Sequence, residues 1–374
     1  TANYEVDTIR PSVDNFTMSD TELKIGDNAT VTITFSETVT NFTNTDISIA
    51  TLDNGTASGS LSTMTPSNDN KTWTGTFIPT DDAEDNTSVL SLEKETYTDL
   101  AGNIGAADNQ TANYEIDTRE PVVSSIAITG QEGRQNNFLN PGDNVSFTAT
   151  FSETVILDNR SGFPQINTIV VGSANREATY TSGSNSDNLT FRYTIKSLNF
   201  SGENDADGVS VGSGNIVLPG SSTIKDLAGN TAILSHSGMN TNSGYMVDTT
   251  APSVDNFTMS DTELKIGDNA TVTLAFSEQI CPNTGSCAVT FTNDDITIAT
   301  LDNLTVTGSL STMTSSDNET WTGTFTPTNN IEDNTSVLSL GTNYTDLAGN
   351  SGLGEQTANY EVDTIRPSVD NFTM

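Results

Sequence analysis

The chain has 374 residues, of which 13 are basic and 49 acidic, so that its formal net charge is −36. This charge excludes a nucleic-acid-binding surface as the main activity, because such surfaces are basic, and it argues against adsorption to an anionic membrane. The length suits roughly two to four domains of about 100 to 200 residues. The acidic excess has two interpretations: it keeps the chain soluble through self-repulsion, or it binds cations.

The start of the chain shows the period-two pattern of short β-strands. Pro11 precedes an expected edge strand over residues 13–18, because proline has a fixed φ and no amide hydrogen for a ladder. In residues 29–35 apolar side chains alternate with threonines, which predicts a strand with one buried face that ends at Ser36-Glu37. Similar stretches begin at Trp73 and Val89. About seven such strands per repeat, separated by polar turns, predict an all-β chain of antiparallel sandwiches.

Repeats divide the chain. The motif Asp-Leu-Ala-Gly-Asn occurs three times, and each copy is followed by an Asp-Thr and a proline. The Asp of this Asp-Thr stands at positions 7, 117, 248 and 363, a spacing of about 110 to 130 residues, which is the size of a domain and not of a solenoid unit. We therefore predict domains at 8–117, 118–248 and 249–363, with 1–7 ending a preceding repeat and 364–374 starting another. Because residues 1–18 and 357–374 are identical, we expect a piece of a longer array.

The three repeats share motifs although their cores differ. Residues 253–273 reproduce residues 12–32, whereas the second repeat is longer and replaces the tryptophan strand. All three keep Phe-Ser-Glu after the second strand, Asp-Leu-Ala-Gly-Asn, and an Asp-Thr and proline at the boundary. This combination resembles the bacterial Ig-like repeats of giant surface adhesins, of the biofilm-associated and type I-secreted kind. The resemblance implies three tandem immunoglobulin-like β-sandwiches in an elongated, extracellular stalk at the cell surface, which calcium at the domain junctions makes rigid.

The placement of acidic residues supports calcium independently. In a seven-stranded sandwich, the end of the second strand, the loop between the sixth and seventh strands and the incoming linker share one pole. Three carboxylates should meet there, and oxygen-only ligation without Cys or His favours Ca²⁺ over zinc. Asp363 would begin a further group. The alternative is that each Asp is an ordinary turn residue bonded to its own backbone. The predicted groups are Asp7, Glu37 and Asp99; Asp117, Glu153 and Asp226; and Asp248, Glu278 and Asp346.

Other acidic residues are weaker candidates for metal ligands, with solvated surface acids as the alternative. Three lie in the turn before the second strand and four in the loop expected before the sixth strand. Asp205 and Asp207 lie in a segment that resembles the start of an EF-hand loop, but Gly214 stands where such a loop needs a bidentate glutamate. The first seven candidates are Asp27, Asp143, Asp268, Glu84, Asp85, Glu332 and Asp333.

The two cysteines and the one histidine give little indication of a catalytic site. Cys281 and Cys287 bracket a short insertion, and in a secreted protein we expect a small disulfide that closes a surface loop, with two free thiols as the alternative. His236, the only histidine, lies in Ser-His-Ser-Gly and is expected to be an exposed loop residue. A Ser-His-Asp or Cys-His enzyme would have to use that one residue. We therefore predict that the chain is not an enzyme.

Two functions of different classes remain. The first is an extender segment of a bacterial surface adhesin that projects a distal binding domain. The second is that one Ig-like module itself binds a glycan or protein ligand. The expected partners are the neighbouring repeats and a host, surface or glycan ligand, with no nucleic acid and no membrane insertion, in a monomeric chain. Near-identity of the first and third repeats favours the extender, because a stalk gains length by duplication.

Overall fold

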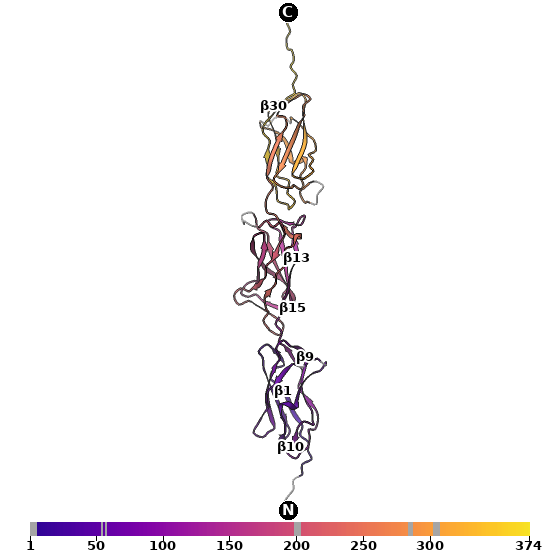
Figure 1. Cartoon of the computed structure of the whole chain (residues 1–374), viewed down its shortest axis with the longest axis vertical. Coiled ribbons are helices and arrows are strands. Elements are labelled where there is room, and N and C mark those ends of the chain that lie inside the picture. Colours follow the sequence, from indigo (N-terminus) through magenta and orange to yellow (C-terminus); the bar gives the residue numbers. More distant parts are fainter. Residues whose placement is uncertain (1–5, 54, 57, 198–202, 283–286, 302–306) are drawn as a thin grey trace, which may run out of the picture.

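The chain is an all-β array in which three β-sandwiches follow one another along the long axis of the molecule (Figure 1). A computed structural model describes residues 6–53, 55–56, 58–197, 203–282, 287–301 and 307–374. Residues 1–5 of the predicted preceding repeat, and residues 283–286 between the cysteines, lie outside this description. Each sandwich has its own hydrophobic core, and we call them the first, second and third domains. Within the described residues, no helix is long and apolar enough to cross a membrane.

The first domain is a sandwich of two sheets. Its elements are β1 Val13–Met18, β2 Glu22–Lys24, β3 Ala29–Phe35, β4 Val39–Thr40, the 3-10 helix η1 Asn44–Asp46, β5 Ile47–Thr51, β6 Gly59–Leu61, β7 Thr65–Pro66, β8 Thr72–Pro79, β9 Glu84–Leu92, β10 Thr98–Asp99, β11 Asn109–Gln110 and β12 Tyr114–Asp117. One sheet has the order β1-β3-β8-β6, with β7 on β8, and the other has the order β11-β9-β12-β2, with β5 on β9. The ladders are antiparallel except that between β12 and β2.

The alternation in β3 explains why this sequence forms two layers. Its apolar side chains from Ala29 to Phe35 are fully buried, while the threonines between them face the more exposed side of the sheet. Burial of one such large side chain contributes about 1.5 to 3 kcal/mol. Aromatic rings complete the core, because Phe42 packs edge-on against Trp73 and Phe35 lies against Tyr97.

The third domain repeats this arrangement. Its elements are β24 Val254–Met259, β25 Glu263–Lys265, β26 Ala270–Phe276, the 3-10 helix η3 Asn293–Asp295, β27 Ile296–Thr300, β28 Gly308–Leu310, β29 Thr320–Pro327, β30 Glu332–Leu340, β31 Glu355–Gln356 and β32 Tyr360–Asp363. The two sheets have the orders β24-β26-β29-β28 and β25-β32-β30-β27, with β31 on β30.

The second domain uses longer strands. Its elements are β13 Val123–Glu132, β14 Phe138–Leu139, β15 Asn144–Asp158, β16 Gln165–Val171, β17 Ala174–Ser182, β18 Ser186–Thr194, β19 Ser210–Val211, β20 Gly214–Val217, β21 Thr223–Lys225, β22 Ser235–His236, the 3-10 helix η2 Ser243–Tyr245 and β23 Met246–Val247. The main path runs β13-β15-β18-β17-β16-β20-β22. β15 pairs first with β18 and then, over its last residues, with β21.

Two local predictions about strand ends and loops were wrong. The second strand of the second domain does not end at Ser152-Glu153, because β15 continues to Asp158 after a register shift between Thr150 and Val155. The acidic pairs at 84–85 and 332–333 do not lie in loops, since they are the first residues of β9 and β30. There they pair with β12 and β32, so that a neighbouring strand extends the ladder into polar sequence.

His236 is also not an exposed loop residue. It lies in β22, pairs with Gly214 of β20, and is 8% exposed because β22 packs against β13. Neither ring nitrogen has a hydrogen-bond partner among the described residues. Burial in this setting lowers the pKa of the imidazole.

Gly75 gives a test of the packing. A Cβ at this position in β8 would lie 2.5 Å from the Met64 sulfur, and Gly323 has the same relation to Met313. We expect Gly75→Val to destabilise the first domain by about 1 to 3 kcal/mol through overpacking. Differential scanning calorimetry should show one transition moving to lower temperature. The control is Thr74→Val, at the exposed position just before Gly75. An equal fall in transition temperature for this variant would contradict this account.

Candidate metal centres

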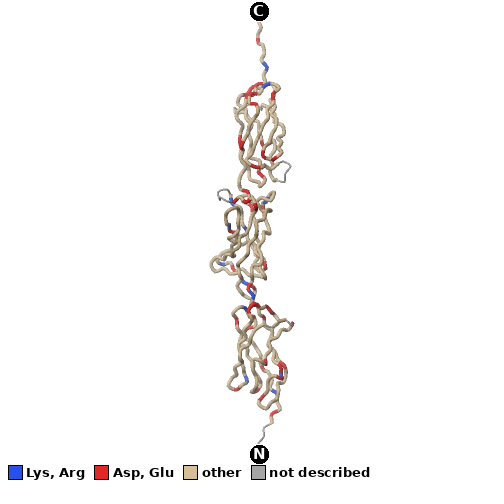
Figure 2. Tube along the Cα trace, viewed as in Figure 1, with Lys and Arg blue, Asp and Glu red and all other residues tan. Residues whose placement is uncertain are grey.

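At the entry to each domain the fold brings together three carboxylates, one from the incoming linker and two from the domain itself. One oxygen from each member of a group lies within 4.8 Å of the others. In every group the Asp of the Asp-Leu-Ala-Gly-Asn loop is buried, and the other two side chains are more accessible. In Figure 2, positions of Asp and Glu along the trace, in red, gather where the domains meet. The groups are Asp7, Glu37 and Asp99; Asp117, Glu153 and Asp226; and Asp248, Glu278 and Asp346.

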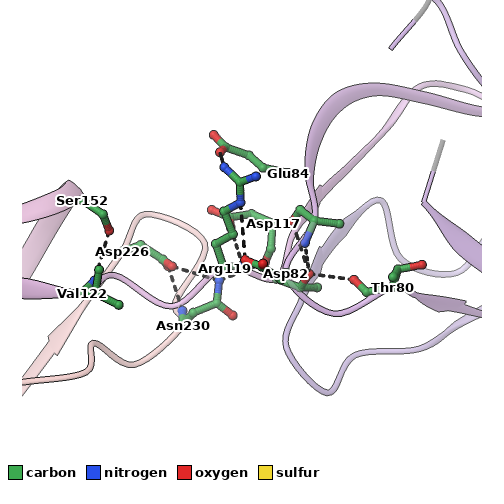
Figure 3. Close-up of polar contacts among 11 residues, drawn as sticks. Thr80, Asp82, Glu84, Asp117, Arg119, Val122, Ser152, Asp226 and Asn230 are labelled. Atoms are coloured by element: carbon green, nitrogen blue, oxygen red, sulfur yellow. Dashed lines mark hydrogen bonds and ion pairs between the residues drawn. The ribbon is translucent and has the colours of Figure 1, made fainter. Parts of the chain in front are cut away.

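The Asp-Leu-Ala-Gly-Asn loop is a tight turn built on its first residue. In the second domain, Asp226 Oδ1 accepts the amide hydrogens of Gly229 at 2.6 Å and Asn230 at 2.8 Å. Asn230 Nδ2 donates to the other carboxylate oxygen at 2.9 Å (Figure 3). Gly229 has a φ of +101°, a left-handed conformation that glycine adopts without steric cost. Asp226 therefore does act as a turn residue, yet Oδ2 accepts only one of these hydrogen bonds and can still accept a further partner.

The asparagine of this loop also holds the linker. Asn230 Nδ2 donates to the backbone oxygen of Asp117 at 2.9 Å. Within the linker itself, the backbone amide of Arg119 donates to Asp117 Oδ1 at 3.2 Å. The sequence pattern marked this asparagine only as part of a motif, and its contact with the linker was missed. The equivalent bonds join Asn103 to Asp7 at 3.2 Å and Asn350 to Asp248 at 3.0 Å.

The glutamate of each group follows a serine that anchors the start of the domain. Ser152 Oγ accepts the amide hydrogen of Val122 at 3.0 Å (Figure 3). This bond fixes the chain just after the linker and leaves Glu153 directed at the group. Sequence reasoning missed this role of the serine, which the recurring Phe-Ser-Glu could have suggested. The same bond joins Ser36 to Ser12 and Ser277 to Ser253.

The glutamates are electrostatically disfavoured as anions. Burial, and then the charges of Asp117 and Asp226, raise the pKa of Glu153 to about 7. Burial, and then the charges of Asp248 and Asp346, raise the pKa of Glu278 to about 7. The first group is more open, but burial and the nearby acids also raise the pKa of Glu37.

Nearby basic side chains offset the charge of the second group only in part, because Arg119 opposes the rise in the pKa of Glu153 less than burial and the acids promote it. Arg119, in the linker, lies 3.3 Å from Glu84 and 3.6 Å from Asp82, which both belong to the first domain (Figure 3). Lys24 is paired with Asp27 at 2.8 Å. Most of the negative charge of the group is therefore left for a cation or for protons.

The donor set fits calcium. Ca²⁺ takes oxygen ligands at about 2.3–2.6 Å, so two oxygens on one ion lie at most about 5 Å apart. The oxygens of each group satisfy this limit. No histidine or cysteine takes part in the groups formed by described residues, which disfavours zinc. Further coordination positions would fall to backbone oxygens or water.

The weaker candidates are placed differently. Asp27 and Asp268 each pair with a lysine of their own turn, and Asp143 accepts the amide of Asn140. Asp363 belongs to none of the groups of three that the described residues form. The remaining candidates also stand outside those groups: Glu84, Asp85, Asp205, Asp207, Glu332 and Asp333.

The segment that resembles an EF-hand loop is occupied by protein donors. Asp205 accepts the amides of Gly172 at 2.7 Å and Gly208 at 2.9 Å. Glu203 is buried, forms an ion pair with Arg176 and accepts the Tyr193 hydroxyl. These oxygens hold the segment against β17 and β18.

Comparison with known proteins agrees with the fold. Residues 7–116 and 248–362 match the bacterial Ig-like domain family. The chain belongs to that family. The second domain lies outside the two matched spans, in keeping with its longer strands. No curated protein matches the chain.

Solved structures of surface proteins are similar to this chain at low sequence identity. The chain is similar to FdeC, an Escherichia coli adhesin, with 10% identity, a TM-score of 0.29, and coverage of 97% of this chain and 100% of that one. It is similar to domains 1–6 of the surface layer protein SbsC, with 13% identity, a TM-score of 0.22, and coverage of 98% and 56%. A second SbsC structure gives 13% identity, a TM-score of 0.21, and coverage of 96% and 55%.

The protonation of Glu153 predicts a pH dependence in calcium-free protein. The pKa of Glu153 is raised to about 7 in the folded state, so this group stabilises the fold below the ordinary glutamate pKa of about 4.3. That contribution is lost as the pH rises through about 7. With chelator present, the melting temperature of the second domain should fall between about pH 5 and pH 8, and Glu153→Gln should reduce this fall.

Asp187→Asn, an exposed change in β18, is the matched control for charge removal. A melting temperature of the Glu153→Gln protein that follows the same pH profile as the parent would show that Glu153 ionises normally.

Proposed function

We propose that this chain is an extender segment of a bacterial surface adhesin, in which Ca²⁺ bound at each domain junction makes the array rigid and a binding domain lies elsewhere in the protein. The observation that carries the proposal is the recurrence of three carboxylates at the entry to each of three domains. Isolated turn aspartates need no such partners. The proposal includes an extracellular location and a structural, non-enzymatic role.

The position of the groups supports a mechanical role for the ion. Asp117 ends β12 of the first domain, whereas Glu153 and Asp226 belong to the second. An ion bound to all three would join the two domains across a short linker. Without the ion, the same charges repel each other and favour separation of the domains. Calcium would thus convert a repulsive contact into a bridge.

The domain division follows from the same reasoning. Each linker Asp lies at the end of one domain and in the carboxylate group of the next: Asp117 is the last residue of β12, and Asp248 directly follows β23. We therefore propose that 8–117, 118–248 and 249–363 are the mechanical units. The chain is proposed to be monomeric, with neighbouring repeats as its direct partners.

Removal of calcium should shorten the molecule and lower its stability. A compact globule of this length would have a radius of gyration of about 21 Å, whereas three sandwiches in line, each some 40 Å long, give ~35 Å. In calcium, small-angle scattering should give the larger value, and chelation should reduce it. Calcium binding to the folded state raises the free energy of unfolding by about 2.7 kcal/mol per site when free calcium is at a hundredfold excess over Kd. At millimolar calcium the gain is smaller if Kd is about 10⁻⁴ to 10⁻³ M, as is common for extracellular modules.

Sodium chloride at matched ionic strength is the control for this experiment. Restoration of both scattering and melting by sodium would show that screening alone is at work, and an unchanged protein after chelation would contradict a calcium site.

Glu153→Gln separates metal binding from turn formation. No hydrogen bond of the described residues depends on the Glu153 side chain, in contrast to Asp226, which holds its own turn. In chelator at about pH 8, the variant should melt at a higher temperature than the parent, because one repelling charge is gone. In millimolar calcium it should melt at a lower temperature, because a ligand is gone.

Glu278→Gln is the matched variant at the next junction, and calorimetric titration of both should show one calcium site weakened in each. An unchanged order of melting temperatures with and without calcium would mean that Glu153 is not a ligand.

A further inference from the structure

The two junctions between domains differ in how the same loop is covered. At the first junction, Leu227 is 72% exposed and Ala228 is exposed. At the second junction, the equivalent Leu347 is half-buried and Ala348 is only 2% exposed. The loops have the same sequence, so the difference lies in what packs against them.

Side-chain amides of the second domain cover the loop at the second junction. Asn136 Nδ2 donates to the backbone oxygen of Leu347 at 2.9 Å, and Gln135 Nε2 donates to the same atom at 3.3 Å. Asn140 Nδ2 donates to the backbone oxygen of Ala348 at 3.1 Å. These bonds satisfy two successive carbonyls of the third domain with donors from the second.

The segment that supplies these amides is itself constrained. Gln135 and Phe138 exchange two backbone hydrogen bonds, of 2.8 and 2.7 Å. Asn136 and Asn137, between them, have φ values of 49° and 70°, which asparagine tolerates better than most residues. The first domain has a shorter turn at the equivalent pole, where the Ile25 amide donates to Asn230 Oδ1 at 2.9 Å.

The disulfide-bonded part of the third domain holds the other side of this segment. The Ala288 amide donates to Gln135 Oε1 at 2.9 Å, and Asn136 Nδ2 lies 3.4 Å from Cys287 Sγ. Gln135 is thus held at both ends of its amide, by Ala288 and by Leu347.

A covalent link sets the position of Cys287 and Ala288. Cys287 is joined to Cys281, which is fully buried and whose amide donates to the Thr345 oxygen at 2.9 Å. Thr345 immediately precedes the Asp-Leu-Ala-Gly-Asn loop of the third domain. The disulfide therefore ties the contact with Gln135 to the core of the third domain. The first domain has no cysteine and lacks this insertion after Glu37.

We propose that residues 135–140 and the disulfide-anchored Cys287 and Ala288 form a brace that keeps the junction between the second and third domains rigid without calcium. The brace makes the array mechanically unequal. The first junction, which lacks the brace, swings when calcium is removed, while the second keeps its angle. The disulfide acts as the covalent anchor of the brace, a role distinct from stabilising the domain core.

The test measures each junction separately in the full chain. Spin labels on unnatural amino acids at Ser48 and Ser182 report on the first junction by pulsed electron resonance, and labels at Ser182 and Thr297 report on the second, since all three positions are exposed strand residues. With chelator, we expect the first pair to lose its narrow distance peak and the second pair to retain it. Gln135→Ala with Asn136→Ala, or Cys281→Ser with Cys287→Ser, should abolish the narrow peak of the second pair in chelator.

Gln356→Ala is the matched control, because that exposed glutamine bonds to Ser339 of its own domain. The brace is refuted if the second pair broadens in the parent chain on chelation, or if the Gln135 and Asn136 variant keeps the narrow peak. A narrow peak in the cysteine variant would refute the role of the disulfide. Failure of the calcium proposal gives a different result: the label pair across the first junction keeps its narrow distance peak in chelator.

Discussion

The junctions depend on one neutral side chain, the asparagine that ends each Asp-Leu-Ala-Gly-Asn loop. Asn230 donates to the Asp226 carboxylate and to the backbone oxygen of Asp117, and it accepts the amide hydrogen of Ile25 from the first domain. An amide offers donors and an acceptor without a charge. It can therefore gather acidic residues around a linker without cancelling their repulsion. A lysine or arginine in its place would cancel part of that repulsion. The negative charge that remains is what a cation can use.

The sequence predicted the framework and the meeting of the acids, but not their local partners. The alternation from Ala29 to Phe35 defined a buried face, and alternate strands of a sandwich necessarily return to the same pole, so Glu37 and Asp99 could be placed together. The continuation of β15 past Glu153 could not be foreseen, because the strand changes partner from β18 to β21. His236 was misplaced for a similar reason, since a polar segment became a buried strand by pairing with β20. These outcomes depend on neighbours distant in the chain.

The second domain shows that the acid group is independent of the core that carries it. Glu37 follows the end of β3, whereas Glu153 lies in an irregular section of a strand that continues. Both nevertheless lie beside a linker Asp and a loop Asp, because the preceding serine bonds to the start of the domain in each case. The constraint is thus local to the pole. Strands and core residues can change, provided that the serine, the loop and the linker remain.

Net charge alone cannot set the shape of such an array. With −36 charges, the chain repels itself and favours extension, but exposed charges are screened beyond about 8 Å at physiological ionic strength. Repulsion also has no preferred angle between domains. Defined angles must come from contacts at the junctions, and two kinds among the described residues matter for the proposals: carboxylates that repel each other, and side-chain amides that bond directly to backbone oxygens. In the proposed function the carboxylates respond to the ionic environment, whereas neutral amides carry no charge for an ion to change, so the proposal ties bending of the rod to the position of each kind along the chain.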